Sequence, residues 1–138
     1  MKLQHIITLL LCISLCMACR GKNGEAKQSD ITVSDTTSYI VNNDFYDFGD
    51  ITAGDIVGYT YTITNTGTHD MVIKNVKTGC ACTTVEVEKT KVEPNESCKV
   101  DIEFNSSGRS GIQIKEIRIF ANVIDEAIKL RFTANVNN

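Results

Sequence analysis

The fold of this chain is indicated most clearly by residues 57–67, which read VGYTYTITNTG. Over positions 57–63, apolar or aromatic side chains alternate with small or polar ones. This period of two is typical of a β-strand with one buried face. The Asn65-Thr66-Gly67 sequence then supplies turn-forming residues where the alternation stops. The stretch therefore predicts a half-buried strand that ends in a turn.

Six further runs of this kind predict strands on both sides of that stretch. Together, the predicted strands cover residues 45–51, 57–64, 71–77, 83–88, 100–104, 112–121 and 128–134. Within the sixth run the alternation slips near Lys115 and Glu116, which predicts a bulge there. About seven strands at a spacing of roughly 12 residues, without helical periodicity, predict an all-β protein with a single antiparallel β-sandwich.

The start of the chain has the order of a secretory signal peptide. Lys2 precedes the apolar run at 6–13, and the small residue Ala18 stands directly before Cys19. A cysteine at this place resembles a bacterial lipobox, so we expect Cys19 to be acylated, palmitate included, and to become the mature N-terminus. Cys16 occupies the position where a lipobox usually carries leucine. Simple secretion, with an unmodified Cys19, is therefore the alternative.

Composition divides the chain into three parts, with the signal peptide at 1–18, the acylated cysteine and a flexible tether at 19–38, and the folded domain at 39–138. The tether is polar and lacks the apolar residues that a core needs. Within it, Asp35-Thr36-Thr37 resembles a short motif that is O-glycosylated in the Bacteroidetes envelope, which makes Thr36 a candidate site; an unmodified loop is the alternative.

The charge of the mature protein argues against one class of partner. Loss of residues 1–18 removes one of 14 cations, Lys2, and none of 17 acids, so the net charge becomes 13 − 17 = −4. Nonspecific nucleic-acid binding requires a basic surface, and we expect no nucleic-acid partner.

Several short motifs occur in a fixed order through the domain. From the N-terminus they are YDFGDI at 46–51, YTITNTG at 61–67, CACT at 80–83 and VEPNE at 92–96, followed by a strand that ends at Ala121-Asn122 and a closing apolar strand. In this order the motifs resemble the bacterial envelope family designated domain of unknown function (DUF) 1573. The resemblance runs from about Asp44 to the C-terminus.

Membership of that family would imply an immunoglobulin-like fold and, since many members are Bacteroidetes lipoproteins, an envelope address. It implies no reaction. Ala81 stands where the family usually has the glycine of Cys-Gly-Cys-Thr, and Asn95 stands where it has the glycine of a Pro-Gly turn. Asparagine tolerates a left-handed backbone almost as well as glycine, so we expect the turn at Asn95 to be kept. Alanine does not, so Ala81 is incompatible with a bend that needs a positive φ.

Three cysteines remain in the mature domain, at Cys80, Cys82 and Cys98. In an oxidising envelope they predict one disulfide and one leftover thiol. On a strand, Cys80 and Cys82 would lie about 6.6 Å apart with parallel Cβ directions, so a direct bond would be strained. A Cys82–Cys98 bond would close a loop of about 15 residues, worth about 3 kcal/mol. The open alternatives are a Cu or Zn site from these cysteines with His69, a thiol-redox centre, or cysteines without a chemical task.

Catalysis has little support in the sequence. Only His5 and His69 could serve as a histidine base, His5 leaves with the signal peptide, and no nucleophile-elbow motif is present. We therefore expect a noncatalytic module, without a cofactor, that binds an envelope protein or glycan. Loops 105–111 and 80–83 are the candidate contact regions.

The expected location is the outer membrane, to which the lipid attaches the protein. The residues after Cys19 are basic, Arg20-Gly21-Lys22, whereas surface export in Bacteroidetes generally uses acidic residues there. We therefore expect the domain to face the periplasm.

Overall fold

The computed structural model describes residues 35–138, which form nine β-strands. The predicted signal peptide, Cys19 and the first part of the tether lie outside these residues. The strands are β1 (Tyr39–Val41), β2 (Phe45–Thr52), β3 (Ile56–Asn65), β4 (Met71–Thr78), β5 (Thr83–Val87), β6 (Lys91–Val92), β7 (Ser97–Asn105), β8 (Gly111–Ala121) and β9 (Ile128–Asn137). In the part of the chain that the structure describes, no helix is long and apolar enough to cross a bilayer.

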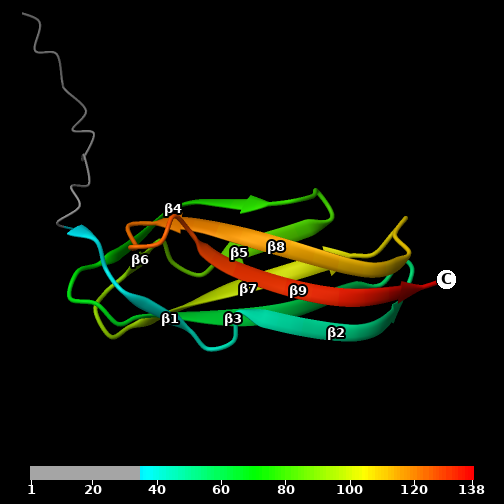
Figure 1. Ribbon diagram of the computed structural model, residues 1–138, viewed down its shortest axis with the longest axis horizontal. Coiled ribbons are helices and arrows are strands. Elements are labelled where there is room, and N and C mark those ends of the chain that lie inside the picture. Colours follow the sequence, from blue (N-terminus) through cyan, green and yellow to red (C-terminus); the bar gives the residue numbers. More distant parts are fainter. Residues whose placement is uncertain (1–34) are drawn as a thin grey trace, which may run out of the picture. The chain divides into compact units, whose positions relative to one another are not determined.

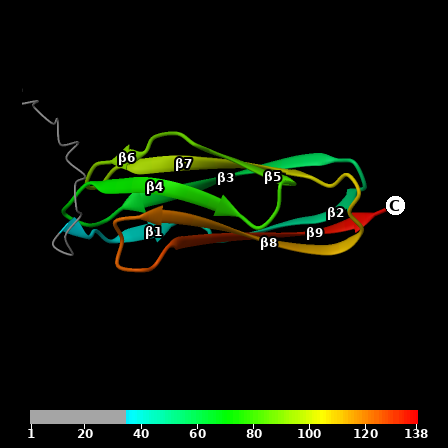
Figure 2. The same cartoon turned by 90° about the horizontal axis from the view of Figure 1, so that it is seen from above.

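The strands form two sheets that pack face to face (Figures 1 and 2). One sheet has the order β1-β3-β7-β5 and the other β2-β9-β8-β4-β6. The inward residues of β3, β7, β8 and β9 supply most of the core; the largest of these side chains belong to Tyr61, Phe104 and Phe132. The predicted all-β sandwich is confirmed. The count of seven strands is wrong because β1 and β6 have only 3 and 2 residues, too few to show alternation.

The chain changes sheets between β1 and β2. Strand β1 pairs antiparallel with β3, whereas β2 pairs in parallel with β9, so the sandwich is not wholly antiparallel. The register of β2 shifts between Asp47 and Asp50, where Gly49 has φ +68°. Tyr46 stacks on Tyr59 of β3 with 3.7 Å between ring centroids, and this contact joins the two sheets across the change.

Strand β8 differs from its sequence-based prediction. Its pairing with β9 is continuous from Gly111 to Ile119, so the bulge predicted near Lys115 is wrong. The apparent slip arises because Ile112 and Ile114 belong to the exposed face of the sheet, with 75% and 69% of their surface exposed. The irregularity in this region lies instead between Ile73 and Asn75 of β4.

Residues 35–38, which we call the entry segment, are held by hydrogen bonds to the sandwich. The Thr37 amide donates to the Asn122 carbonyl at 2.9 Å, and the Thr37 hydroxyl donates to Asn65 Oδ1 at 2.7 Å. Asn122 Nδ2 donates to the Asp35 carbonyl at 2.6 Å. Thr37 is only 2% exposed. The folded domain therefore begins before Tyr39, and the last residues assigned to the tether are part of it.

Asn65 is the centre of this arrangement. It is fully buried, and its side-chain nitrogen donates to the carbonyls of His69 at 2.8 Å and Val92 at 2.9 Å. Its Oδ1 also accepts the Gly67 amide at 3.1 Å. A Cβ on Gly67 would overlap the Thr37 hydroxyl and lie 2.7 Å from the Ser38 nitrogen. The Asn-Thr-Gly motif thus closes β3 and makes room for the entry segment.

Candidate functional site

Cys80 and Cys82 form a disulfide, with their Cα atoms 5.2 Å apart. They lie in the turn between β4 and β5 rather than on a strand, so the separation falls within the normal range for a disulfide. The expectation of strain assumed extended backbone, which this segment does not have. Asn95, at φ 65°, is the one non-glycine residue of the described chain with a positive φ, so the turn at Asn95 is as predicted and Ala81 meets no conflict.

Cys98 is a free and fully buried thiol at the start of β7. Its Sγ donates to the Lys89 carbonyl at 3.2 Å, and burial raises the pKa of the thiol. Cys82 lies beside the other end of β7, because its carbonyl accepts the Asn105 amide at 2.9 Å. Asn105 lies seven positions after Cys98 along the strand, which corresponds to about 23 Å. The preferred Cys82–Cys98 bond is therefore absent, and that expectation is corrected.

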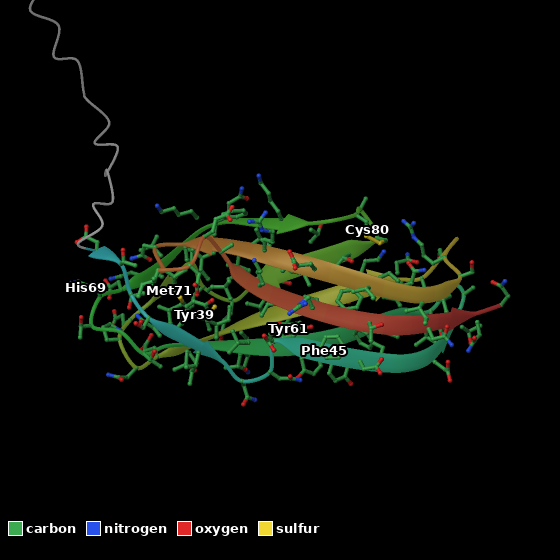
Figure 3. All side chains as sticks on the ribbon, viewed as in Figure 1. Tyr39, Phe45, Tyr61, His69, Met71 and Cys80 are labelled. Atoms are coloured by element: carbon green, nitrogen blue, oxygen red, sulfur yellow. A yellow bond between two sulfur atoms is a disulfide. The ribbon has the colours of Figure 1, made fainter. Side chains whose placement is uncertain are left out.

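The candidate metal ligands are also divided between the two ends of the sandwich. The His69 carbonyl contacts Asn65, near Cys98, while Cys80 lies toward the opposite end (Figure 3). The exposed His69 ring has the Thr68 hydroxyl 3.3 Å from Nδ1. Residues 35–138 contain no group of three histidine, cysteine or acidic side chains that could hold a metal ion. The structure therefore does not bring Cys80, Cys82, Cys98 and His69 together as a ligand set.

Three connections meet at the end of the sandwich that carries the disulfide. We call them the distal loops: residues 53–55, 79–82 and 106–110. Ser106 holds two of them together, since its amide donates to the Asp55 carbonyl at 2.9 Å and its Oγ accepts the Gly54 amide at 3.0 Å. The third is joined through the Asn105 amide and the Cys82 carbonyl. The two loops that the sequence indicated as contact regions are therefore neighbours.

Ser106 was not recognised from the sequence, although it is completely buried. Its Oγ lies 2.9 Å from the carbonyls of both Thr52 and Asp55. In the sequence it is one of two adjacent serines before a glycine, which reads as an ordinary polar loop. Only the contact with the loop at 53–55, fifty residues earlier, distinguishes Ser106 from Ser107.

A shallow groove lies beside the entry segment. Its volume is about 440 Å³, and its lining includes Tyr39, Ile40, Ile124 and Lys129. The Tyr39 hydroxyl donates to Asp125 Oδ2 at 3.0 Å; burial, followed by this hydrogen bond, raises the pKa of Tyr39 to about 12. The groove contains a neutral phenol and mixed charges, and it offers no nucleophile paired with a base.

The candidate glycosylation site lies at the edge of the entry segment. Thr36 is partly exposed, and its neighbours in the motif are held: the Asp35 carbonyl by Asn122 and the Thr37 side chain by Asn65. A glycan on Thr36 would therefore stand on an ordered part of the domain.

Comparisons with known proteins agree with the fold. The family model described as protein of unknown function, DUF1573, matches residues 39–136. No curated protein sequence matches the chain. A protein of unknown function from Porphyromonas gingivalis W83 has a TM-score of 0.66 at 17% identity, over 79% of this chain and 51% of that one. The chain thus spans about half the length of that protein.

Two further structures extend the likeness to other proteins. The ASH/PapD-like domain 7 of human CEP192 has a TM-score of 0.58 at 12% identity, over 75% of this chain and 88% of that one. The VesB protease of Vibrio cholerae has a TM-score of 0.56 at 14% identity, over 76% and 32%. At these identities the likeness concerns the immunoglobulin-like fold alone. The family model, in contrast, covers nearly the whole sandwich, and the chain therefore belongs to the DUF1573 family.

Proposed function

We propose that this protein is a noncatalytic interaction module of the bacterial cell envelope. It is attached to the membrane through acylated Cys19 and binds a protein or glycan partner through the distal loops. The observation that carries the proposal is the gathering of residues 53–55, 79–82 and 106–110 at the end of the sandwich opposite the entry segment (Figure 1). Loops placed at one end of a rigid β-sandwich are a common binding surface.

The geometry of the loops favours recognition of a preformed shape. Ser106 ties the loop at 53–55 to the loop at 106–110 and to the end of β2, and the Cys80–Cys82 bond closes the turn at 79–82 on itself. A surface that is already ordered loses less conformational entropy on binding than a mobile one. The chain enters the domain at the other end, so a tether there leaves the distal loops free to meet a partner.

Site-specific photocrosslinking in intact cells tests this proposal. A benzophenone amino acid at Ser107, in a distal loop, is expected to give an adduct of defined mass. The same probe at Thr68, an exposed loop residue at the entry end, is the matched control. Adducts at both positions in equal yield, or at neither, would contradict binding through the distal loops.

Membrane attachment is tested separately. In the full chain, Cys19→Ala is expected to abolish palmitate labelling and to move the protein from the membrane to the soluble fraction. Globomycin treatment is expected to block processing of the signal peptide. Protease treatment of whole cells is expected to leave the domain intact, because the outer membrane would cover a periplasmic domain. Unchanged labelling and partition would reject lipidation at Cys19.

A thiol-redox role is the second candidate function, and the Cys80–Cys82 bond is the observation that favours it. Such a role would require the bond to open and close during function. Replacing both residues with serine separates the two candidates. The adduct at Ser107 persists in this double variant if the loops bind by shape, and it is lost if thiol chemistry is required.

A further inference from the structure

Strand β8 is unpaired along part of one edge. Strand β4 pairs with β8 only from Ile117 to Ala121, because β4 ends at Thr78 and the chain crosses to the other sheet through the disulfide turn. Within residues 35–138, no strand pairs with that edge of residues 111–116. Figure 1 shows that β4 runs beside only one part of β8 and ends well before the N-terminal end of β8. Unpaired strand edges are templates for adding another strand.

Two apolar side chains stand on the exposed face beside this edge, among polar neighbours, since Asn135 lies opposite Ile112 and Thr133 opposite Ile114 on β9. Ile112 and Ile114 are 75% and 69% exposed, and Phe45, on the same face of the sheet, is 46% exposed. A single exposed isoleucine needs no explanation, but two adjacent ones at an unpaired edge combine apolar surface with free backbone groups.

We propose that residues 111–115 of β8 pair antiparallel with the same residues of a second copy, so that two five-stranded sheets join into one. A two-fold axis through Gln113 places Ile112 of each copy opposite Ile114 of the other. Residues directly opposite in an antiparallel pair project from the same face, so the four isoleucines form one cluster. An axis through Ile114 would instead place Ile112 against a Glu116 carboxylate.

The same register suits the inward side chains. The two Gln113 side chains face each other. Each Nε2 already donates one hydrogen to the Ser110 carbonyl at 2.9 Å, which leaves its second hydrogen and one lone pair of Oε1 for the other copy. Lys115 lies opposite Gly111, which has no side chain. An inward lysine often protects a strand edge, but the Lys115 amine is already within 3.2 Å of Gln113 Oε1. The ladder ends two residues before Ile117, where β4 begins its pairing.

The paired edge is short, so the interface is small and the dimer is weak and concentration-dependent. A C2 arrangement uses the same patch on both copies and therefore closes at two, without leaving a further free patch. This interface adjoins the distal loops, because β8 begins directly after residues 106–110. The dimer gives an adduct of twice the mass of the chain and is tested at residues 112–116, so either proposal can fail without the other.

Cysteine trapping in cells that express the full chain tests the register. In the proposed dimer, the two Cα atoms at position 113 lie about 4.5–5.5 Å apart, within disulfide range. At position 116 the two copies are about 20 Å apart. Gln113→Cys is therefore expected to give a disulfide-linked dimer on a nonreducing gel, and Glu116→Cys, like the parent chain, is expected to stay monomeric.

A charge in the patch is expected to abolish trapping. Adding Ile112→Lys to Gln113→Cys should reduce the linked dimer at least tenfold, whereas adding Ile124→Lys should not; Ile124 is 80% exposed but lies on another surface. Melting temperatures establish that all variants fold. The second-copy pairing would be overturned by equal trapping at positions 113 and 116 or by no trapping at position 113. It would also be overturned by an adduct whose mass is not twice that of the chain.

Discussion

Replacing Asn65 with alanine tests whether the Asn-Thr-Gly motif holds the entry segment. The side chain makes four hydrogen bonds, of which those to the Thr37 hydroxyl and the Val92 carbonyl are buried. Leaving a buried partner unsatisfied costs about 1–3 kcal/mol. The partners at Gly67 and His69 are part-buried, and water can replace some of their bonding. The expected loss is about 3–5 kcal/mol of unfolding free energy, a large share of the roughly 5–15 kcal/mol typical of a domain.

Urea denaturation of the full chain measures this loss directly. The midpoint should fall while the slope stays unchanged, because the surface exposed on unfolding is nearly the same. In a thermal melt the expected decrease is about 12–20 °C, at about 4 °C for each kcal/mol in a domain of this size. Asn75→Ala is the matched control, since Asn75 is an exposed asparagine of β4. A loss below about 1 kcal/mol, or the same loss in both variants, would refute the role assigned to Asn65.

Three other changes have distinct expected results. Gly67→Ala should expose the entry segment to proteases, because its Cβ would lie 2.7 Å from the Ser38 nitrogen. Gly79→Ala, whose Cβ meets nothing within 4 Å, should leave cleavage unchanged. Equal cleavage of the two variants would contradict this. Cys98 should react with maleimide only as the domain unfolds, and rapid alkylation of the native protein would show that the thiol is not buried. Burial raises the pKa of the Cys98 thiol in the folded state above its ordinary value of 9.0. The stability that the neutral thiol contributes is therefore complete below pH 9.0 and is lost as the pH rises through the folded-state pKa. In a pH series of melts, Cys98→Ala should lack this decline. Replacing Cys80 and Cys82 together by serine should cost only about 1–2 kcal/mol in urea, because the loop that they close is very short, and a loss above about 4 kcal/mol would contradict this.

Much of the fold follows from alternation along the chain. The seven predicted strands are all present, and the apolar residues that alternate along the last one, such as Leu130 and Phe132, are completely buried. The parallel pairing of β2 with β9 could not be predicted, because alternation in a single strand does not identify its neighbour. Strand β8 carries isoleucines on both faces, since Ile112 and Ile114 are exposed whereas Ile117 and Ile119 are buried. Alternation in the sequence therefore did not identify the face to which Ile112 belongs.

The candidate site was less accessible to sequence reasoning. The spacing of Cys80 and Cys82 indicates a pair, but whether a bond can form depends on whether the backbone there is a strand or a turn. The position of Cys98 relative to them depends on the direction of β7 and on which of its ends lies beside Cys82. Both quantities arise from pairing between distant segments, so no local pattern contains them.

The sequence alone determined the class of fold, the positions of most strands and the resemblance to the DUF1573 family, because these depend on the period of apolar residues and on short local motifs. The tertiary structure alone decided which cysteines bond, which loops gather at the distal end, and why Asn65 and Gly67 stand where they do. Each of these depends on contacts between segments far apart in the chain, such as Thr37 with Asn65 and Asp55 with Ser106. Such contacts exist only after the sheets have packed, since it is the packing that brings these polar groups within hydrogen-bonding distance.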